Sequence, residues 1–272
     1  MTLSYVKLYR RYTILVGIGP YLTKRFITMS ARTREYRPVD ICVDIGAGNA
    51  PYKGTISKCF GVNNYVALDF APSDATNVVG DATSLPIQTQ SVELVVCFEA
   101  LQHISHYHTV LDETVRILRP GGRIILSVPF VYGECDVKDF RRWTIAGITE
   151  DLEERGFSVL SVARRGGPFF AIASIMIWAI QHVIPGSRIT WRSPRTAAAY
   201  FREGLVWLLA FPLILLSWLA VGLDSMLPAR GLYAGSFIFA GLDQRRRSTP
   251  TLNCGAIPRE HLNKRATAWI WA

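Results

Sequence analysis

The sequence predicts an α/β fold built around a mainly parallel sheet. From residue 41 onward, short apolar runs alternate with segments of helical periodicity, and this alternation is typical of β-α-β units. The chain has 272 residues, enough for one large domain or two small ones. Half of the residues are hydrophobic and only 19% are charged, which excludes a disordered, collagenous or low-complexity protein.

The pattern places most elements directly. Apolar runs predict strands, and the spacing of apolar residues predicts helices between them. A Pro-Gly-Gly sequence at 120–122 ends the second helix and leads into the next strand. The predicted strands are 41–45, 65–69, 94–98, 123–128, 157–163 and 233–241, and the predicted helices are 53–60, 106–118 and about 145–155.

Two long apolar segments separate the last two strands. Residues 166–187 and 204–223 contain no Asp, Glu, Lys or Arg. The second segment is long enough for a bilayer core if fully helical, although Pro212 would kink it. A buried helical pair or a dimer interface remains the alternative. Two crossings would put the arginines of 186–203 outside, against the positive-inside tendency, so we expect a shallow, monotopic hairpin at the cytoplasmic face.

Charge divides the chain into four predicted parts. The net charge is +9, but residues 38–165 hold 11 basic and 16 acidic side chains, so the excess lies elsewhere. Basic residues beside apolar stretches suit an anionic membrane surface at least as well as nucleic acid. The parts are a basic N-terminal helical segment (1–37), the α/β domain (38–165 and 232–242), an apolar helical hairpin (166–231) and a basic tail (243–272).

The N-terminal segment and the cysteines predict an intracellular protein. The apolar run at 12–22 is too short to span a bilayer and predicts a short interfacial or domain-capping helix. Five cysteines form neither a C-x-x-C pair nor an even-numbered framework, which favours reduced thiols.

The strongest chemical signal is a glycine turn after the first predicted strand. Gly46 and Gly48 follow an apolar strand and precede a helix, and glycine there lets a ligand approach the backbone closely. Asp69 ends the next strand, where a carboxylate can accept both ribose hydroxyls. Pro51 replaces the third glycine of a dinucleotide fingerprint, so an adenosyl sulfonium ligand fits better than a pyrophosphate. Alternatively, Gly46 and Gly48 only form an ordinary strand-to-helix turn that binds no ligand.

With these residues, the sequence resembles the class I S-adenosylmethionine-dependent methyltransferases. The matching segments are VDIGAGNAPY at 43–52, YVALDF at 65–70, GDATSLP at 80–86, SVELVVCFEALQHI at 91–104, ILRPGGRIILSVP at 117–129 and DFRRWT at 139–144. The resemblance implies a Rossmann-like, mainly parallel seven-stranded sheet with a final antiparallel strand, plus an apolar helical insertion before that strand. The first and last segments resemble a type 11-like bacterial subgroup associated with polysaccharide and lipid modification.

The resemblance also implies a cofactor site for S-adenosylmethionine. Asp44 would lie near the methionine amino group, or would only cap the turn. The other implied contacts are Gly46, Ala47 and Gly48 with the methionine part, Asp69 with the ribose, Asp81 and Ala82 with the adenine, and Phe98 and Glu99 closing the pocket, with Phe70 as a further cofactor contact.

The acceptor side offers several candidates for a general base. A hydroxyl acceptor benefits from one, and the candidates are His103, His106, His108, Glu134, Asp136 and Asp139. We favour His103, Asp136 and Asp139, although His103 can be structural and Asp139 can simply pair with Arg141 or Arg142. No metal site is predicted, because Gln102 stands where a metal-binding Glu would be needed.

These observations support one function over two alternatives. We expect a membrane-associated methyltransferase acting on a hydroxyl of a lipid, glycolipid or lipid-linked sugar, with a homodimer as an option. A nucleic-acid acceptor is disfavoured, because Cys97-Phe98-Glu99-Ala100 replaces the Asn/Asp-Pro-Pro-Tyr sequence of that class. The alternatives are methylation of a hydrophobic soluble natural product, with the apolar insertion as a lid or dimer element, and a non-catalytic binding module.

Overall fold

A computed structural model describes the sheet, the helices around it and part of the apolar segments. The described residues are 18–32, 38–135, 137–183, 208, 211–212, 215–216, 218–224, 226 and 231–243. In chain order the elements are α2 (Ile18–Arg32), β1 (Ile41–Ile45), α3 (Lys53–Phe60), β2 (Asn64–Asp69), β3 (Val78–Val79), β4 (Val92–Phe98), the 3-10 helix η1 (Leu101–His103), α4 (Tyr107–Ile117), β5 (Leu118–Pro129), α5 (Ile145–Glu153), β6 (Phe157–Arg165), α6 (Pro168–Val183) and β7 (Gly235–Leu242).

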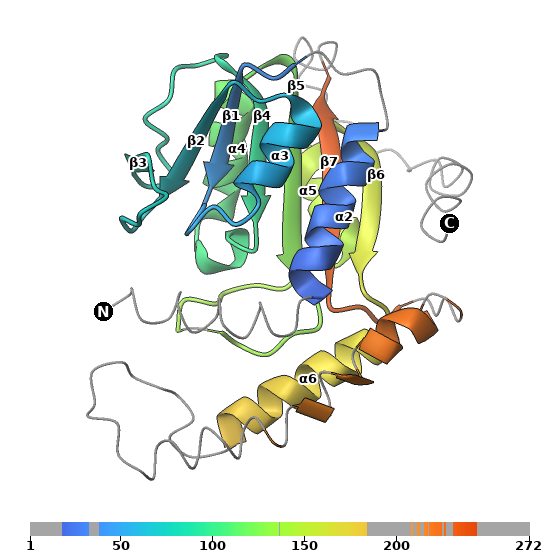
Figure 1. The fold of residues 1–272 in the computed structure, drawn as a ribbon. Helices are drawn as coiled ribbons and strands as arrows, with labels where there is room; N and C mark the ends of the chain where they lie inside the picture. The colour runs from blue at the N-terminus through green and yellow to red at the C-terminus, as the bar shows by residue number, and fades with distance from the viewer. Residues whose placement is uncertain are drawn as a thin grey trace. The chain divides into compact units, whose positions relative to one another are not determined.

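The seven strands form one sheet in the order β3-β2-β1-β4-β5-β7-β6 (Figure 1). The pairs β1–β2, β2–β3, β1–β4 and β4–β5 are parallel, whereas the arrow of β7 runs in the opposite direction in Figure 1. This confirms the predicted fold class. The chain leaves β1 toward β2 on one side and returns to β4 on the other. The carboxyl ends of β1 and β4 therefore flank a topological switch point, where α/β sheets bind ligands.

Helices cover both faces of the sheet. On one face, Val110 and Leu111 of α4 and Ile148 and Leu152 of α5 are buried in the same apolar cluster as residues of β1, β4, β5 and β7. On the other face, aromatic rings join α2 and α3 to β7. Phe26 stacks on Phe237 with centroids 5.1 Å apart, and Phe60 lies 6.4 Å from Phe239.

Several boundaries differ from the sequence prediction. β5 begins at Leu118, five residues earlier than expected, because Leu118 pairs with Val92 before an irregularity in the ladder. The predicted turn at 120–122 therefore lies within this strand. β3 was not predicted, since two valines are too short a run for a period to be recognised. Among the described residues, α2 begins at Ile18, within the apolar run at 12–22, and continues to Arg32.

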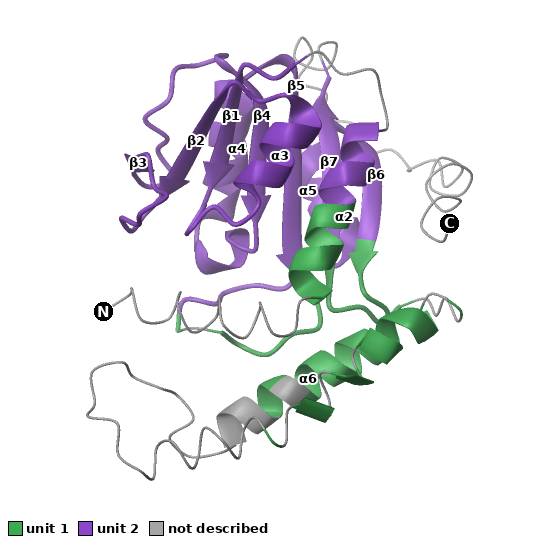
Figure 2. Cartoon of the chain, in the orientation of Figure 1, with its two compact units in different colours: residues 1–25, 129–137, 164–235 green, residues 26–128, 138–163, 236–272 purple. Residues whose placement is uncertain are grey.

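The chain divides into two compact units (Figure 2). Unit 1 comprises residues 1–25, 129–137 and 164–235, and unit 2 comprises 26–128, 138–163 and 236–272. Unit 1 has its own small core, in which Ile18 and Leu22 of α2 pack with Phe170 and Ala171 of α6. No helix within the described ranges combines the length and hydropathy needed to cross a membrane.

Candidate functional site: the carboxyl edge of the sheet

The glycine turn after β1 has the backbone geometry that its sequence predicts. Gly46 and Ala47 donate their N–H groups to the carbonyl of Leu68 over 2.9 and 3.0 Å, which ties the turn to β2. Gly46 has φ +71°, and a Cβ atom there would lie 2.4 Å from the Cβ of Ala100. Gly48 has φ +53°, and a Cβ there would meet no atom within 4 Å. Gly46 is therefore required for packing, whereas Gly48 borders open space.

Asp69 lies at the carboxyl end of β2 and is fixed by two backbone groups. Its Oδ2 accepts the N–H of Gly48 over 2.8 Å, and its Oδ1 accepts the N–H of Ala71 over 2.9 Å. Each carboxylate oxygen has a second lone pair available for a ligand hydroxyl. The predicted pair of glycine turn and acid thus meets directly in the structure.

Asp44 is buried beside this turn, with 3% of its surface exposed. Its Oδ2 accepts the hydroxyl of Tyr65 over 2.6 Å. The pKa of Asp44 is raised to about 7: burial is the largest cause, the hydrogen bond from Tyr65 opposes it, and the negative charge of Asp69 adds to it. Sequence reasoning missed Tyr65. Its side chain reaches Asp44 because Tyr65 pairs with Cys42 in register, which puts it on the same face as Asp44.

Ser73 is a second residue that the sequence analysis did not identify. Its hydroxyl donates to the carbonyl of Gly48 over 2.6 Å, and its own loop is closed by a contact with Thr76. The turn at Gly48 is therefore held from β2 and from the loop that follows it. No motif marks this contact, because it joins residues 25 positions apart across two loops.

Phe98 and Glu99 follow β4 at the same edge. Glu99 has φ +51°, and its Oε1 accepts the hydroxyl of Ser127 on β5 over 2.7 Å. The ring of Phe98 meets Tyr52 edge to face, with centroids 5.1 Å apart. The unusual backbone of Glu99 is thus supported by a neighbouring strand, which fixes the carboxylate of this residue at the switch point.

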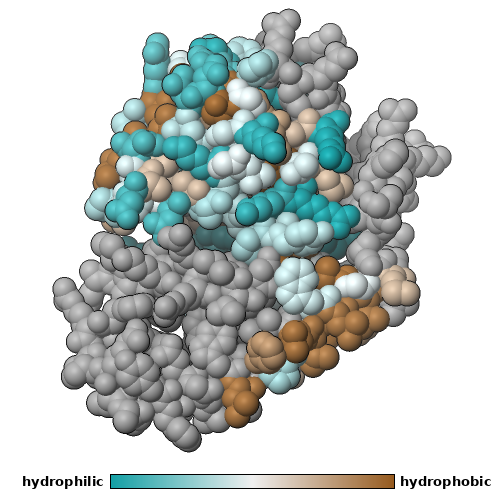
Figure 3. Space-filling model, in the orientation of Figure 1, coloured by the Kyte–Doolittle hydropathy of each residue, from teal (hydrophilic) through white to brown (hydrophobic). Residues whose placement is uncertain are grey.

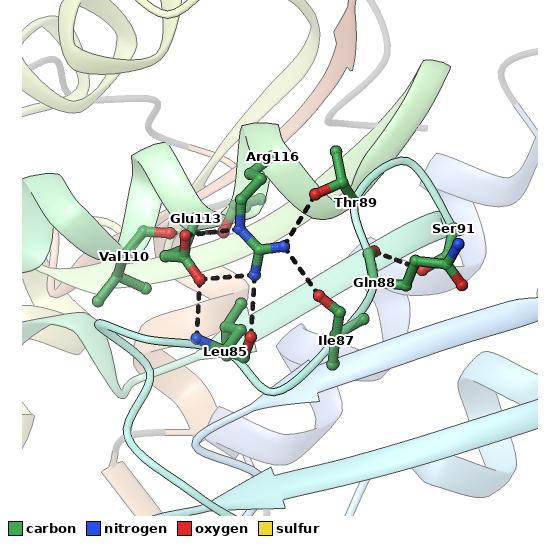
Figure 4. Close-up of polar contacts among 9 residues, drawn as sticks. Leu85, Ile87, Gln88, Thr89, Ser91, Val110, Glu113 and Arg116 are labelled. Atoms are coloured by element: carbon green, nitrogen blue, oxygen red, sulfur yellow. Dashed lines mark hydrogen bonds and ion pairs between the residues drawn. The ribbon is translucent and has the colours of Figure 1, made fainter.

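Asp81, Ala82 and Phe70 lie farther along this edge, in loops. Asp81 is exposed and accepts the backbone N–H and hydroxyl of Thr83, which lowers its pKa. The ring of Phe70 is 77% exposed. The loop after Ala82 is anchored to α4, where Arg116 donates to the carbonyls of Leu85 and Ile87 and pairs with Glu113 (Figure 4). This anchoring fixes the end of the loop that carries Asp81.

The three favoured acceptor-side candidates have different surroundings. His103 Nδ1 lies 3.1 Å from the carbonyl oxygen of Lys138. A carbonyl only accepts, so Nδ1 carries the proton and Nε2 presents its lone pair. The amide nitrogen of Gln102 lies 3.4 Å from that Nε2 atom. Asp139 is instead buried in an ion pair with Arg142, at 2.9 Å between Oδ2 and Nη2. Asp136 lies outside the described residues.

The remaining candidates are less suited to proton transfer. His106 is exposed at the start of α4, where its side chain makes no cap hydrogen bond. His108 lies 3.2 Å from Arg155, and Glu134 contacts Trp178 through its backbone carbonyl. Trp143 packs edge to face on Tyr107, as a core residue. Within the described part of the chain, no three His, Cys, Asp or Glu side chains cluster to hold a metal ion.

Comparisons with known proteins agree with the fold. Residues 43–126 match the family described as a methyltransferase domain. The chain is 28% identical to malonyl-acyl-carrier-protein O-methyltransferase from Methylococcus capsulatus, over 46% of this chain and 56% of the relative. It is 27% identical to phthiotriol/phenolphthiotriol dimycocerosates methyltransferase 1 from Mycobacterium ulcerans, over 46% of this chain and 40% of that protein. The chain spans about half the length of the curated relatives it matches.

A solved structure supports the fold over a larger share of the chain. A putative sarcosine dimethylglycine methyltransferase from Galdieria sulphuraria superposes with a TM-score of 0.52 at 15% identity, over 82% of this chain and 86% of that chain. The sheet therefore has the class I methyltransferase fold. Residues 43–126 match the methyltransferase domain family, and the comparisons support S-adenosylmethionine as the cofactor.

Proposed function

We propose that the protein is an S-adenosylmethionine-dependent methyltransferase that methylates a hydroxyl of a lipid, glycolipid or lipid-linked sugar at the membrane surface. The observation that carries the enzymatic part is the Asp69 carboxylate, which the N–H groups of Gly48 and Ala71 hold beside the open turn. Fixing this carboxylate before the ligand binds reduces the entropy lost on binding.

The residues at the carboxyl edge fit the cofactor. The carboxylate of Asp69 would accept the ribose hydroxyls, and Asp44 would lie toward the methionine amino group. When bound, S-adenosylmethionine supplies a sulfonium methyl group that is already activated toward a nucleophile. The protein then mainly has to position the acceptor and exclude water. The further residues assigned to the cofactor are Gly46, Ala47, Gly48, Phe70, Asp81, Ala82, Phe98 and Glu99.

We assign His103 as the general base that takes the acceptor proton. The carbonyl of Lys138 fixes its tautomer, so Nε2 carries the lone pair, and the acceptor hydroxyl would replace the 3.4 Å contact with the amide of Gln102. Asp139 is less suited, because its carboxylate is engaged by Arg142. The 3-10 helix η1 places His103 four residues after Glu99, on the loop that leaves β4.

The class of acceptor rests on two independent observations. One relative is named as an O-methyltransferase of malonyl-acyl-carrier protein, and another is named for phthiotriol and phenolphthiotriol dimycocerosates. In this chain, two charge-free apolar segments lie between β6 and β7. The first observation favours an oxygen acceptor. The second favours an apolar acceptor and a monotopic position at the cytoplasmic face, which is compatible with the polysaccharide- and lipid-modifying subgroup.

Calorimetric titration with S-adenosylmethionine tests the cofactor site. We expect Asp69→Ala and Gly48→Ala each to weaken binding by about tenfold to a hundredfold, because the first removes charged hydrogen bonds and the second places a methyl group in the open space. Asp74→Ala, an exposed acid in the loop after β2, is the matched control and should bind normally. Unchanged affinity in both site variants would contradict the assignment.

Product formation tests the acceptor and the base. Incubation with a cell lipid extract should yield S-adenosylhomocysteine and a lipid heavier by one methylene. His103→Ala should lower kcat by about 10²- to 10⁴-fold with little change in cofactor affinity, whereas His106→Ala should not. Equal loss in both variants would exclude His103 as the base, and absence of product with any extract would favour a non-catalytic module.

A further inference from the structure

Exposed apolar side chains are concentrated in unit 1. Seventeen large hydrophobic residues are exposed among the described side chains, and fourteen of them belong to unit 1. Figure 3 shows the corresponding hydrophobic surface over α6. Contiguous exposed apolar patches on a protein surface mark interaction sites, which makes this surface a candidate docking site.

One part of the patch is a face of α6. Phe169, Ile172, Ile175 and Met176 are exposed. The last three lie three, six and seven residues after Phe169, which puts all four on one side of the helix. Phe170, Ala171 and Ala173 are buried on the other side. α6 is therefore apolar on both sides, whereas a helix at the surface of a globular domain normally carries polar residues outward.

The second apolar segment repeats this arrangement. Its described helical residues expose Leu208, Phe211, Leu215 and Leu219 at intervals of three or four residues. Ala220 and Asp224 are buried on the opposite side of the same helical period. Phe211 and Leu219 expose 56% and 58% of their surface. Among the described residues, both apolar segments thus expose one hydrophobic face.

An aromatic pair and cationic residues accompany these two faces within unit 1. The rings of Tyr21 and Trp218 lie 6.1 Å apart, and both side chains are partly exposed. Lys24 and Arg25 are exposed on the following turn of α2. Tyr and Trp are enriched at the boundary between lipid chains and headgroups, and basic residues are attracted to anionic headgroups.

The charge of the flanking sequence favours a lipid surface over a second copy of the chain. Residues 186–203, between the two apolar segments, contain four arginines and one glutamate, and residues 1–37 contain eight basic residues and one acidic residue. A symmetric dimer through this patch would bring like charges together. An anionic membrane would neutralise the same charges.

We propose that unit 1 docks on an anionic lipid surface through the exposed faces of α6 and the second apolar segment. The exposed parts of Tyr21 and Trp218 and the cations Lys24 and Arg25 lie at the headgroup boundary. This inference rests on the proposed function in one respect: the acceptor of the methyl group would be found at the same lipid surface. Docking is separable from catalysis, because none of these residues belongs to the cofactor site.

Flotation of the full chain with vesicles tests the proposal. We expect binding to vesicles of phosphatidylcholine with phosphatidylglycerol, weaker binding to phosphatidylcholine alone, and loss of the difference at high salt. The combined variant Ile172→Ser, Ile175→Ser and Leu219→Ser should weaken partition by at least about tenfold. The control Val79→Ser with Phe140→Ser changes exposed apolar residues of unit 2 and should bind as the wild type does. Arg25→Gln should weaken binding to anionic vesicles by about fivefold.

Other outcomes would overturn the docking surface. Absence of flotation, or equal loss in the Ser variant and in the control, contradicts it. A dimer in sedimentation that the Ser variant converts to a monomer, without vesicle binding by either, assigns the surface to a second copy. Titration with S-adenosylmethionine separates the two proposals, because normal cofactor binding without flotation defeats docking alone. Flotation without cofactor binding defeats the proposed activity and leaves docking in place.

Discussion

The carboxyl group of Asp44 makes the free energy of unfolding decrease as the pH rises toward neutrality, which is unusual for a carboxyl group. A carboxyl whose pKa is about 7 in the folded chain and about 4 in the unfolded chain binds its proton more strongly in the folded state. Its contribution to the free energy of unfolding is full below about pH 4 and is lost as the pH rises through about 7. Most acidic groups with a lowered pKa, such as Asp81, have the opposite effect.

Asp44→Asn should therefore stabilise the cofactor-free protein increasingly as the pH rises. Relative to the wild type, we expect its free energy of unfolding to increase between pH about 4 and about 7, by up to about 4 kcal/mol. Urea unfolding across this pH range measures the difference. Asp81→Asn serves as the control without a slope in this range, because a carboxyl with a lowered pKa is ionised in both states above about pH 4 and affects the pH dependence only below that. A pH-independent difference for Asp44→Asn would show that its carboxyl group is ionised throughout.

At the residue scale, the sequence predicted the backbone conformation and the neighbours that depend on residue type within one short motif. The glycines and Asp69 were predicted because a turn that a ligand approaches needs glycine and a diol needs an acid. Tyr65 could not be predicted, since its contact with Asp44 depends on the register between β1 and β2. The pairing of Asp139 with Arg142 was foreseen only as an alternative, because the sequence does not show which partner wins.

At the scale of elements, α6 begins at a carboxylate supplied from far along the chain. Asp224 accepts the N–H groups of Gly167, Phe169 and Phe170 over 2.8, 3.1 and 3.1 Å. A Cβ on Gly167 would lie 2.6 Å from this carboxylate, so the approach requires glycine. The acid replaces a local capping residue and complements the positive end of the helix dipole. It also joins the second apolar segment to the start of α6.

Removing this cap should loosen the start of α6. Asp224→Ala leaves three N–H groups without their acceptor near a buried site, at a cost of about 1–3 kcal/mol. Hydrogen exchange in the peptide covering 167–176 should accelerate by about fivefold to a hundredfold, whereas peptides from β1 and β4 should be unaffected. Glu150→Ala, an exposed acid on α5, provides the comparison. Unchanged exchange in the Asp224 variant would mean that water or another group replaces the carboxylate.

Elements were predictable where they were long and periodic. The strands β1, β2 and β4 and the helix α4 follow from apolar runs and helical spacing. The start of β5 was predicted wrongly, because Pro120-Gly121-Gly122 favours a turn by propensity while pairing of Leu118 with Val92 extends the strand. β3 depends on its pairing with Leu68 and Asp69, which no local pattern contains.

At the scale of the whole molecule, most of unit 1 is a sequence insertion between two strands that are adjacent in the sheet of unit 2. β6 and β7 are neighbours in the sheet, although most of unit 1 lies between them in sequence. The apolar cluster that fills unit 2 consists only of unit 2 residues. The sequence indicated this division through the two charge-free segments, but it did not show that residues 1–25 and 129–137 belong with them.

A chain in which a short hairpin replaces residues 168–231 should therefore keep the sheet and its cofactor site. The replacement is geometrically simple because Ala234 N–H already donates to the carbonyl of Arg165, at the end where β6 passes to β7. We expect cooperative unfolding and S-adenosylmethionine binding within about threefold of the full chain, together with complete loss of vesicle flotation. In the shortened chain, Ile18 and Leu22 lose the residues of α6 on which they pack. A second shortened chain with both residues replaced by Ser therefore controls for poor solubility caused by their exposure. Loss of cofactor binding in a shortened chain that still unfolds cooperatively would show that unit 1 contributes to the cofactor site itself.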